Sequence, residues 1–239
     1  MNAGAPRCWG VLPAAGVGNR MGGERPKQYL ELAGATLFEH SLSALLDSPR
    51  ITGVMVALHA DDQWANQLDV TADPRVHITT GGAQRSDSVL AALVALESLA
   101  EDRDWVLVHD AARPCLPRAE LEDLIEAVLT SGVGGILAEP VVDTVKRADG
   151  QGRVIQTLDR DCLWRAQTPQ MFPLGQLRAA LKAAGEQGLA VTDEASAMEM
   201  AGLPVQLVKG SSRNLKVTVP ADLDLAAWYL SRPPAGPVE

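Results

Sequence analysis

The sequence predicts an α/β fold, Rossmann-like, with a mainly parallel β-sheet covered by helices on both faces. Short apolar runs alternate with amphipathic segments from one end of the chain to the other, and this alternation is typical of parallel strands joined by helices. The length of 239 residues is enough to bury a substantial core. It favours a single domain over residues 1–239 rather than two full domains.

Apolar runs predict the strands of this sheet in chain order. They are residues 9–14 (WGVLPA), 53–59 (GVMVALH), 76–81 (VHITTG), 105–111 (WVLVHDA), 134–141 (GGILAEPV) and 204–210 (PVQLVKG). Amphipathic segments separate them, so each strand is expected to be followed by a connection that packs back onto the sheet.

Helices are predicted where apolar residues recur at helical spacing. Thr36 and Glu39 form a capping box that opens the helix at 37–48. The pattern returns at 87–100 and at 119–132, and Gly132 ends the second of these as expected for a helix C-terminus. The remaining predicted helices lie at 174–187, at 193–201 and from residue 220 onward.

The pattern breaks at residues 140–161, where apolar and polar residues alternate around ADGQG. Such alternation around a glycine-bearing turn indicates an antiparallel hairpin. A hairpin inserted into a parallel α/β domain cannot easily bury both of its faces on its own core. We therefore expect a protruding β-arm at about 140–163 that packs against a second subunit, and a loose Pro-rich tail at about 232–239.

Composition limits the partners of the chain. A net charge of −9 and a pI near 5.0 argue against a nucleic-acid-binding surface, so any anion site must be a local cluster of cations. No uncharged apolar stretch approaches the roughly 18 residues of a membrane-spanning helix. Cys8, Cys115 and Cys162 are odd in number and widely spaced, which favours reduced thiols in a cytoplasmic protein.

A glycine-bearing loop follows the first predicted strand, within the stretch GVLPAAGVGNRMGGERPKQYLEL at 10–32. Gly16 and Gly18 fit the start of a dinucleotide-binding GxGxxG motif. However, Met21 occupies the third glycine position, and no acid ends the second strand at the required distance. The sequence also lacks the GxxxxGK[ST] of a Walker cradle. The loop fits neither familiar motif.

Three cations, Arg20, Arg25 and Lys27, lie within eight residues of one another in this loop. Unpaired backbone N–H groups of a glycine loop can face phosphate oxygens, and nearby cations add point charges. The alternative interpretation is a solvated basic loop. Local spacing leaves both open and favours a phosphate site.

Asp110 ends the apolar strand WVLVHD, at the carboxyl end where open α/β sheets bind ligands. A carboxylate there can hold Mg²⁺ that bridges phosphate oxygens. The alternative is a helix N-cap, but the following AARP is a poor helix start.

His40, His59 and His77 lie in helix or strand settings that favour structural roles, and His109 is expected to face the packing layer.

Seven motifs, in this order, carry a resemblance to a known family and cover nearly the whole chain. They are LPAAGVGNRMGGERPKQYLELAG, GGAQRSDSVLAAL, VHDAARP, PVVDTVKRA, TLDRDCLWRAQTPQMF, TDEASAME and NLKVTVPADL. The set resembles the 2-C-methyl-D-erythritol 4-phosphate cytidylyltransferases of the non-mevalonate isoprenoid pathway. The resemblance implies the nucleotidyltransferase (nucleotide-diphospho-sugar transferase) type of fold, and a homodimer whose arms complete the neighbouring subunit's active site.

The resemblance also implies site residues. The catalytic cations are Arg20, Lys27 and Lys216. The nucleotide-binding residues are Pro13, Ala14, Ala15, Gly16, Gly18, Gly82, Ala83, Arg85, Ser88, Asp110 and Ala111. The substrate-binding residues are Asp110, Arg113, Thr144, Arg160, Thr168, Thr192 and Lys216, and Asp110 is the ligand of Mg²⁺ or another divalent cation. Ala83 departs from the family pattern, which often has an acid beside Gly82, so weaker ribose contacts are expected.

The implied reaction couples CTP to 2-C-methyl-D-erythritol 4-phosphate, giving 4-diphosphocytidyl-2-C-methyl-D-erythritol and pyrophosphate. A phosphate monoester is largely dianionic at neutral pH, so this nucleophile needs no general base. A ribitol 5-phosphate cytidylyltransferase is the nearest alternative, because it would share the opening motif and the metal site. An NAD(P)-dependent oxidoreductase and a non-catalytic nucleotide-binding regulator fit the residues less well.

Overall fold

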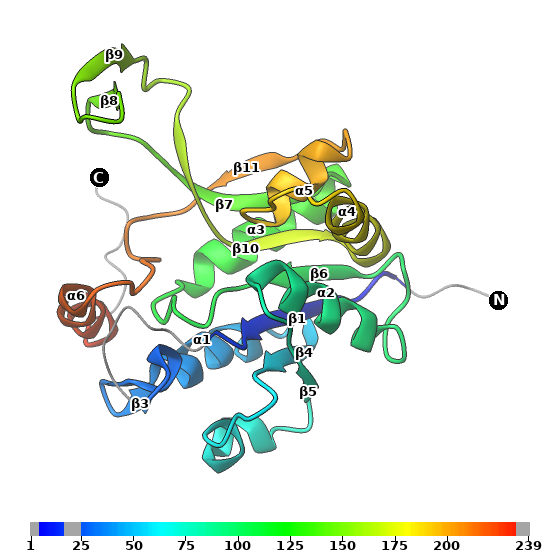
Figure 1. Ribbon diagram of the computed structural model, residues 1–239. Helices are drawn as coiled ribbons and strands as arrows, with labels where there is room; N and C mark the ends of the chain where they lie inside the picture. The colour runs from blue at the N-terminus through cyan, green and yellow to red at the C-terminus, as the bar shows by residue number, and fades with distance from the viewer. Residues whose placement is uncertain (1–4, 17–24, 233–239) are drawn as a thin grey trace.

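A computed structural model describes residues 5–16 and 25–232, and a seven-stranded sheet forms its centre (Figure 1). The strand order is β11-β7-β10-β6-β1-β4-β5. β10 runs antiparallel to its neighbours β6 and β7, and the other neighbouring strands are parallel, which confirms a mainly parallel sheet. The strands are β1 (Cys8–Ala14), β4 (Ile51–Leu58), β5 (Val76–Thr80), β6 (Trp105–Val108), β7 (Gly135–Pro140), β10 (Trp164–Pro173) and β11 (Gln206–Lys209).

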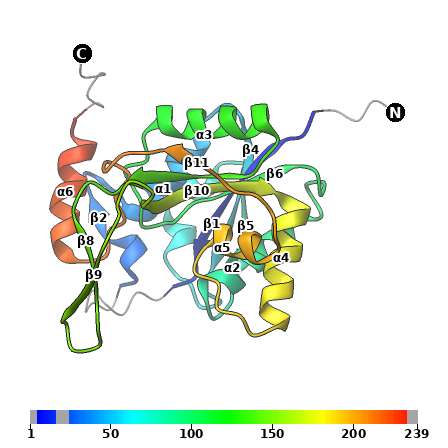
Figure 2. The same cartoon turned by 90° about the horizontal axis from the view of Figure 1, so that it is seen from above.

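Helices cover both faces of the sheet, as predicted (Figure 2). Alternate residues of β1 point to opposite sides, so that Leu12 joins one buried cluster and Val11 joins the other. One face packs against α1 (Leu37–Leu46) and α3 (Arg118–Ser131). The other packs against α2 (Arg85–Leu96), α4 (Leu174–Glu186) and α5 (Glu194–Met200).

Smaller elements complete the described part of the chain. α6 (Pro220–Leu230) packs beside the short strands β2 (Glu31–Leu32) and β3 (Ala35–Thr36), where Leu32, Leu37 and Ala226 are buried together. Three short 3₁₀ helices are η2 (Lys27–Tyr29), η3 (Ala65–Gln67) and η4 (Asp69–Ala72). Within residues 5–16 and 25–232, no helix has both the length and the apolar character needed to cross a bilayer.

Two predicted helix ends are confirmed in detail. The Thr36 hydroxyl accepts the Glu39 N–H at 3.2 Å, and the Glu39 carboxylate accepts the Thr36 N–H at 2.7 Å, so the capping box opens α1. α3 ends at Gly132, whose φ of +68° lies in the left-handed region that glycine adopts without strain.

The strand β10 is missing from the sequence-based prediction, which has no strand between the arm and α4. The reason is its polar centre, since Gln167, Thr168 and Gln170 are buried at 6%, 4% and 1% exposure. The Gln167 amide donates to the Ser211 carbonyl at 2.8 Å, and the Gln170 amide donates to the Asp193 carboxylate at 2.8 Å. Side-chain hydrogen bonds thus replace the apolar run that would have identified a buried strand.

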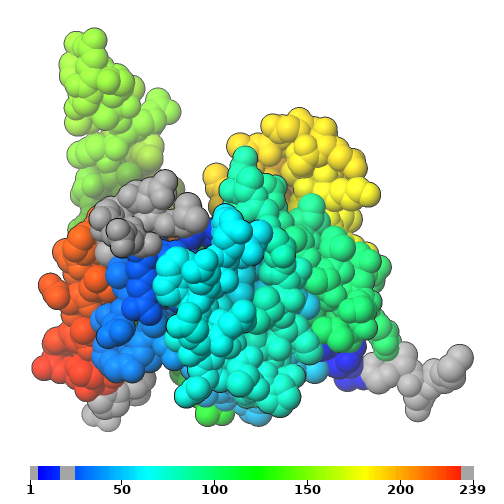
Figure 3. All heavy atoms as spheres, turned by 60° about the horizontal axis from the view of Figure 1, so that its bottom comes forward, coloured from blue at the N-terminus to red at the C-terminus, as the bar shows by residue number. Residues whose placement is uncertain are grey.

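The predicted hairpin is present as β8 (Val145–Ala148) paired with β9 (Val154–Leu158). It projects from the body between β7 and β10 and stands clear of the rest of the molecule (Figures 1 and 3). Its apolar side chains face solvent in the single chain, with Val142, Val154 and Ile155 exposed at 71%, 63% and 57%. A hairpin this exposed has little of the apolar burial that stabilises isolated two-stranded sheets.

Cys8 and Cys115 are buried, Cys162 is exposed, and all three are free thiols. Burial raises the pKa of the Cys8 and Cys115 thiols to about 11. Both thiols therefore remain protonated near neutral pH.

Candidate active site

A pocket of about 320 Å³ opens at the carboxyl ends of β1 and β6, where the strand order reverses direction on the two sides of β1. This switch point is where open α/β sheets bind ligands. We call it the main pocket; its lining residues are Pro13, Ala14, Ala15, Gly16, Lys27, Gln28, Gly82, Ala83, Gln84, Arg85, Ser88, Asp110, Ala111, Ala112 and Lys216. An adjoining side pocket of about 290 Å³ shares Arg85, Asp110 and Lys216 with it.

Backbone groups form one wall of the main pocket. The Gln28 side chain donates to the Ala14 carbonyl at 2.8 Å and so fixes the end of β1. Next to this strand end, the Gly82 N–H donates to the buried Ser88 hydroxyl at 3.1 Å. A Cβ on Gly82 would lie 2.3 Å from the Asp87 Cβ, so only glycine fits. The result is a wall without large side chains, which a planar ligand can approach closely.

Asp110 is the centre of charge between the two pockets. Its carboxylate lies 2.9 Å from Arg85 Nε, 2.8 Å from Lys216 Nζ and 3.7 Å from Arg113 Nε. Burial raises the pKa of Asp110, but the charges of Arg85, Lys216 and Arg113 outweigh this effect and hold the pKa well below its usual range. The carboxylate is therefore ionised at neutral pH.

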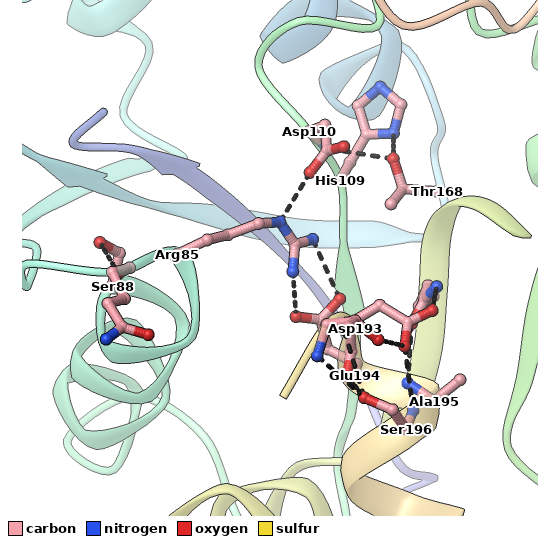
Figure 4. Close-up of polar contacts among 12 residues, drawn as sticks. Arg85, Ser88, His109, Asp110, Thr168, Asp193, Glu194, Ala195 and Ser196 are labelled. Carbon is pink, nitrogen blue, oxygen red and sulfur yellow. Dashed lines mark hydrogen bonds and ion pairs between the residues drawn. The ribbon is translucent and has the colours of Figure 1, made fainter. Parts of the chain in front are cut away.

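A chain of hydrogen bonds fixes the backbone at Asp110 (Figure 4). The Asp110 N–H donates to the Thr168 hydroxyl at 3.0 Å, and Thr168 Oγ1 lies 3.0 Å from His109 Nδ1. His109 Nε2 lies 3.1 Å from the Arg113 carbonyl. Burial lowers the pKa of His109 to about 4, so the ring is neutral, and these contacts assign its proton to Nε2. As predicted, His109 lies in the packing layer.

Two segments that are distant in the sequence converge on residues 214–217. Lys27 Nζ donates to the Val217 carbonyl at 2.9 Å, beside Lys216. Arg113 Nη1 donates to the Asn214 carbonyl at 2.7 Å. This convergence gathers cations from the start, middle and end of the sequence around the two adjoining pockets of an acidic protein.

A second carboxylate, Glu194, contacts Arg85 from the side away from Asp110 (Figure 4). Arg85 Nη1 and Nη2 lie 2.6 and 3.1 Å from the two Glu194 oxygens. Burial raises the pKa of Glu194, and the charge of Arg85 opposes this effect. Burial also disfavours the charged form of Arg85, but its two carboxylate partners raise its pKa, so the guanidinium remains a cation.

The structure places most of the predicted site residues together. In the main pocket are Pro13, Ala14, Ala15, Gly16, Lys27, Gly82, Ala83, Arg85, Ser88, Asp110, Ala111 and Lys216. In the side pocket are Arg113, Thr168 and Thr192. Thr144 and Arg160 are exposed on the arm and line neither pocket, and Arg160 Nη1 donates to the Val142 carbonyl. Gly18 and Arg20 lie outside the described residues.

Sequence reasoning missed Gln28, Asn214 and Glu194. The Asn214 side chain donates to the Thr168 carbonyl at 2.7 Å and thereby ties the 214–217 segment to β10. All three are buried polar residues, with exposures of 6% or less. Gln28 adjoins Lys27, Asn214 is the first residue of the motif NLKVTVPADL, and Glu194 lies inside TDEAS. Nothing in local spacing shows which atoms these side chains meet.

Comparisons with known proteins identify the family of this chain. The family model for 2-C-methyl-D-erythritol 4-phosphate cytidylyltransferase matches residues 9–232. The enzyme of that name from Pseudomonas putida KT2440 is 53% identical over 95% of this chain and 96% of its own length.

Solved structures with this printed name are also similar. The one from Francisella tularensis has a TM-score of 0.80 at 36% identity, over 93% of this chain and 99% of that chain. The one from Thermus thermophilus has a TM-score of 0.78 at 32% identity, over 95% of this chain and 100% of that chain. The chain therefore belongs to the 2-C-methyl-D-erythritol 4-phosphate cytidylyltransferase family.

Proposed function

We propose that this chain transfers the cytidylyl group of CTP to the phosphate of 2-C-methyl-D-erythritol 4-phosphate in the main pocket, with release of pyrophosphate. One observation carries the assignment to this pocket. The carboxylate of the buried Asp110 lies within 3 Å of both Arg85 and Lys216, at the switch point of the sheet. Two anions must meet in this reaction, and such a cluster can hold both of them.

The nucleophile in this proposal is the substrate's own phosphate. With a second pKa near 6, a phosphate monoester is largely dianionic at neutral pH and attacks the α-phosphorus of CTP without a general base. The described residues that line the two pockets include no histidine. His109, behind them, is neutral, and both of its ring nitrogens have partners. Catalysis therefore depends on positioning and on charge.

The chain's own cations would supply that charge. Arg20 and Lys27 from the opening motif would bind the triphosphate together with Lys216. These three cations would stabilise charge on the α-phosphoryl oxygens and on the departing pyrophosphate. Arg113 and Thr192 would bind the polyol phosphate from the side pocket. The Thr168 hydroxyl holds the Asp110 N–H and is close to His109, so its main part would be to position Asp110.

Asp110 would also hold a divalent cation, which we propose to be Mg²⁺. It is the one acidic side chain among the described residues lining the main pocket. One carboxylate is enough for Mg²⁺, because nucleotide sites commonly hold this ion with one or two carboxylates plus substrate phosphates. When bound there, the ion would neutralise part of the triphosphate charge.

For the base and ribose, we propose the wall formed by Ala14, Ala15 and Gly16 together with Gly82 and Ser88. Small side chains allow a pyrimidine edge to approach the backbone of this wall closely. Ala83, beside Gly82, offers its backbone but no side-chain acceptor, so ribose contacts there would be weaker than in relatives with an acid.

Pyrophosphate release tests the substrate assignment. The purified protein with Mg²⁺ would be given CTP, UTP or ATP, each with methylerythritol phosphate or ribitol phosphate. We expect the fastest release with CTP and methylerythritol phosphate. Release with other pairs but none with this one would contradict the proposal, and faster release with ribitol phosphate would favour the ribitol 5-phosphate enzyme.

We further propose that the active enzyme is a homodimer in which the arm carries Thr144 and Arg160 into the partner's side pocket. Two observations support this arrangement: the arm exposes apolar side chains, and neither Thr144 nor Arg160 lines the main or the side pocket of its own chain. An Arg160 guanidinium can bind a phosphate in bidentate geometry, which a lysine cannot reproduce.

Subunit mixing tests the shared site. Lys27→Met and Arg160→Ala chains should each be nearly inactive alone. A mixed dimer keeps one intact site, from the body of the Arg160→Ala chain and the arm of the Lys27→Met chain. An equal mixture should therefore recover about a quarter of the parental activity. No recovery in verified mixed dimers would contradict sharing.

A further inference from the structure

Glu194 is a buried carboxylate whose position has no explanation in the reaction described so far. It is 0% exposed and lines neither pocket, whereas its partner Arg85 lines both. The pair joins the first residue of α2 to the first residue of α5 across 109 positions of sequence. Glu194 therefore meets the active site through Arg85.

We propose that Glu194 is a positioning residue that orients the Arg85 guanidinium toward Asp110 and the triphosphate. This inference rests on the proposed function of the main pocket. Glu194 itself touches neither substrate, because Arg85 lies between it and both pockets.

The geometry of the guanidinium supports this role. Glu194 binds the two terminal nitrogens of Arg85 at 2.6 and 3.1 Å, and this paired contact fixes the plane of the group. In that plane Nε points at Asp110, 2.9 Å away. A single contact would leave the group free to rotate, whereas two carboxylates on different edges give it one orientation.

Both carboxylates are tied to the same strand, β10. Asp110 is held through its N–H to Thr168, at 3.0 Å. The start of α5 is held through Gln170, which accepts the Ala195 N–H at 2.8 Å and donates to Asp193 at 2.8 Å. Contacts from one strand thus hold both of the acids that share Arg85.

Charge balance gives Glu194 a second effect on Asp110. Arg85, Arg113 and Lys216 all face the Asp110 carboxylate. Glu194 takes two of the N–H groups of Arg85, so that Arg85 meets Asp110 through Nε at Oδ1, while Oδ2 lies 2.8 Å from Lys216 Nζ and 3.7 Å from Arg113 Nε. Without the Glu194 charge, Arg85 would turn its terminal nitrogens onto Asp110 and compete there with Lys216 and with a divalent cation.

The experiment is a double-mutant cycle with Glu194→Gln, Arg85→Gln and the two together. Glu199→Gln is the matched control, because Glu199 is exposed on the same helix. The measurements are kcat/KM for CTP, the Kd of CTP by calorimetry without the polyol phosphate, and Tm. Glu194→Asp, which keeps the charge on a shorter side chain, tests rescue.

We expect Glu194→Gln to lower kcat/KM for CTP and to weaken CTP binding, each by on the order of tenfold or more. Both quantities are measured at a temperature below the Tm of the variant. Glu194→Asp should lose less, and Glu199→Gln should match the parent. In the Arg85→Gln background, Glu194→Gln should cause little further loss, because its effect passes through Arg85. A purely structural role would change Tm and leave the other two quantities unchanged.

The inference would be overturned if folded Glu194→Gln had the same kcat/KM for CTP and the same Kd of CTP as the parent protein. Losses that simply add in the double variant would also overturn it. If Glu194→Gln does not fold, the double variant is compared with Arg85→Gln, because it replaces the ion pair with two amides. The kcat/KM for CTP and the Kd of CTP must then be the same in these two variants. A further loss in the double variant would overturn the inference. A parent protein that neither binds nor uses CTP would instead refute the proposed function.

Discussion

Replacing Asp110 with asparagine should lower kcat by on the order of a thousandfold. The amide keeps the shape of the side chain but removes the negative charge that faces Arg85, Arg113 and Lys216. It also removes the one acidic group among the described residues of the main pocket. The measurement is the steady-state rate of pyrophosphate release at saturating CTP, Mg²⁺ and methylerythritol phosphate.

The same substitution leaves two largely buried arginines with less negative charge beside them, so Tm should fall. Rates must therefore be compared well below the Tm of the variant. Asp123→Asn is the matched control, because Asp123 is exposed on α3, and it should keep the parental rate. A rate for Asp110→Asn within tenfold of the parent would remove Asp110 from the catalytic site.

Replacing Lys27 with methionine should lower kcat by about a hundredfold or more, with the fold intact. Methionine is unbranched and similar in length, so the packing of the stem is largely kept. The lost ammonium group lies against the Val217 carbonyl, next to Lys216, where the triphosphate is proposed to bind. The measurement is the same pyrophosphate assay, with circular dichroism to compare the folds.

Lys182→Met provides the matched control for this change, since Lys182 is exposed on α4 and does not line the main pocket. It should turn over at the parental rate. Near-normal turnover in Lys27→Met would show that the ammonium group does not stabilise the transition state.

The sequence predicts those parts of the fold that depend on local chemistry. The apolar runs predict the parallel strands, Thr36 and Glu39 predict the start of α1, and Gly132 predicts the end of α3. β10 escapes prediction because its buried centre is polar and is satisfied by side chains that lie far away in sequence. No local pattern can reveal a strand whose stability depends on such distant partners.

The site follows the same division. Motif resemblance brings Lys27, Asp110 and Lys216 into one prediction, and the structure then shows Lys216 within 3 Å of Asp110. The position of Glu194 could not be predicted, because its contact with Arg85 depends on how the first residues of α2 and α5 come together on the same face of the sheet. Long-range packing decides which buried acids share a cation, and spacing in the sequence does not record it.

The most direct test of the central claim is a crystal structure of the protein with CTP and Mg²⁺. We expect the cytosine and ribose to lie against residues 14–16 and Gly82. The triphosphate should lie within hydrogen-bond distance, about 3 Å, of Lys27 and Lys216, with the metal ion on Asp110. CTP bound away from Gly16, Lys27 and Asp110 would contradict the claim that these cations assemble around the nucleotide's phosphorus.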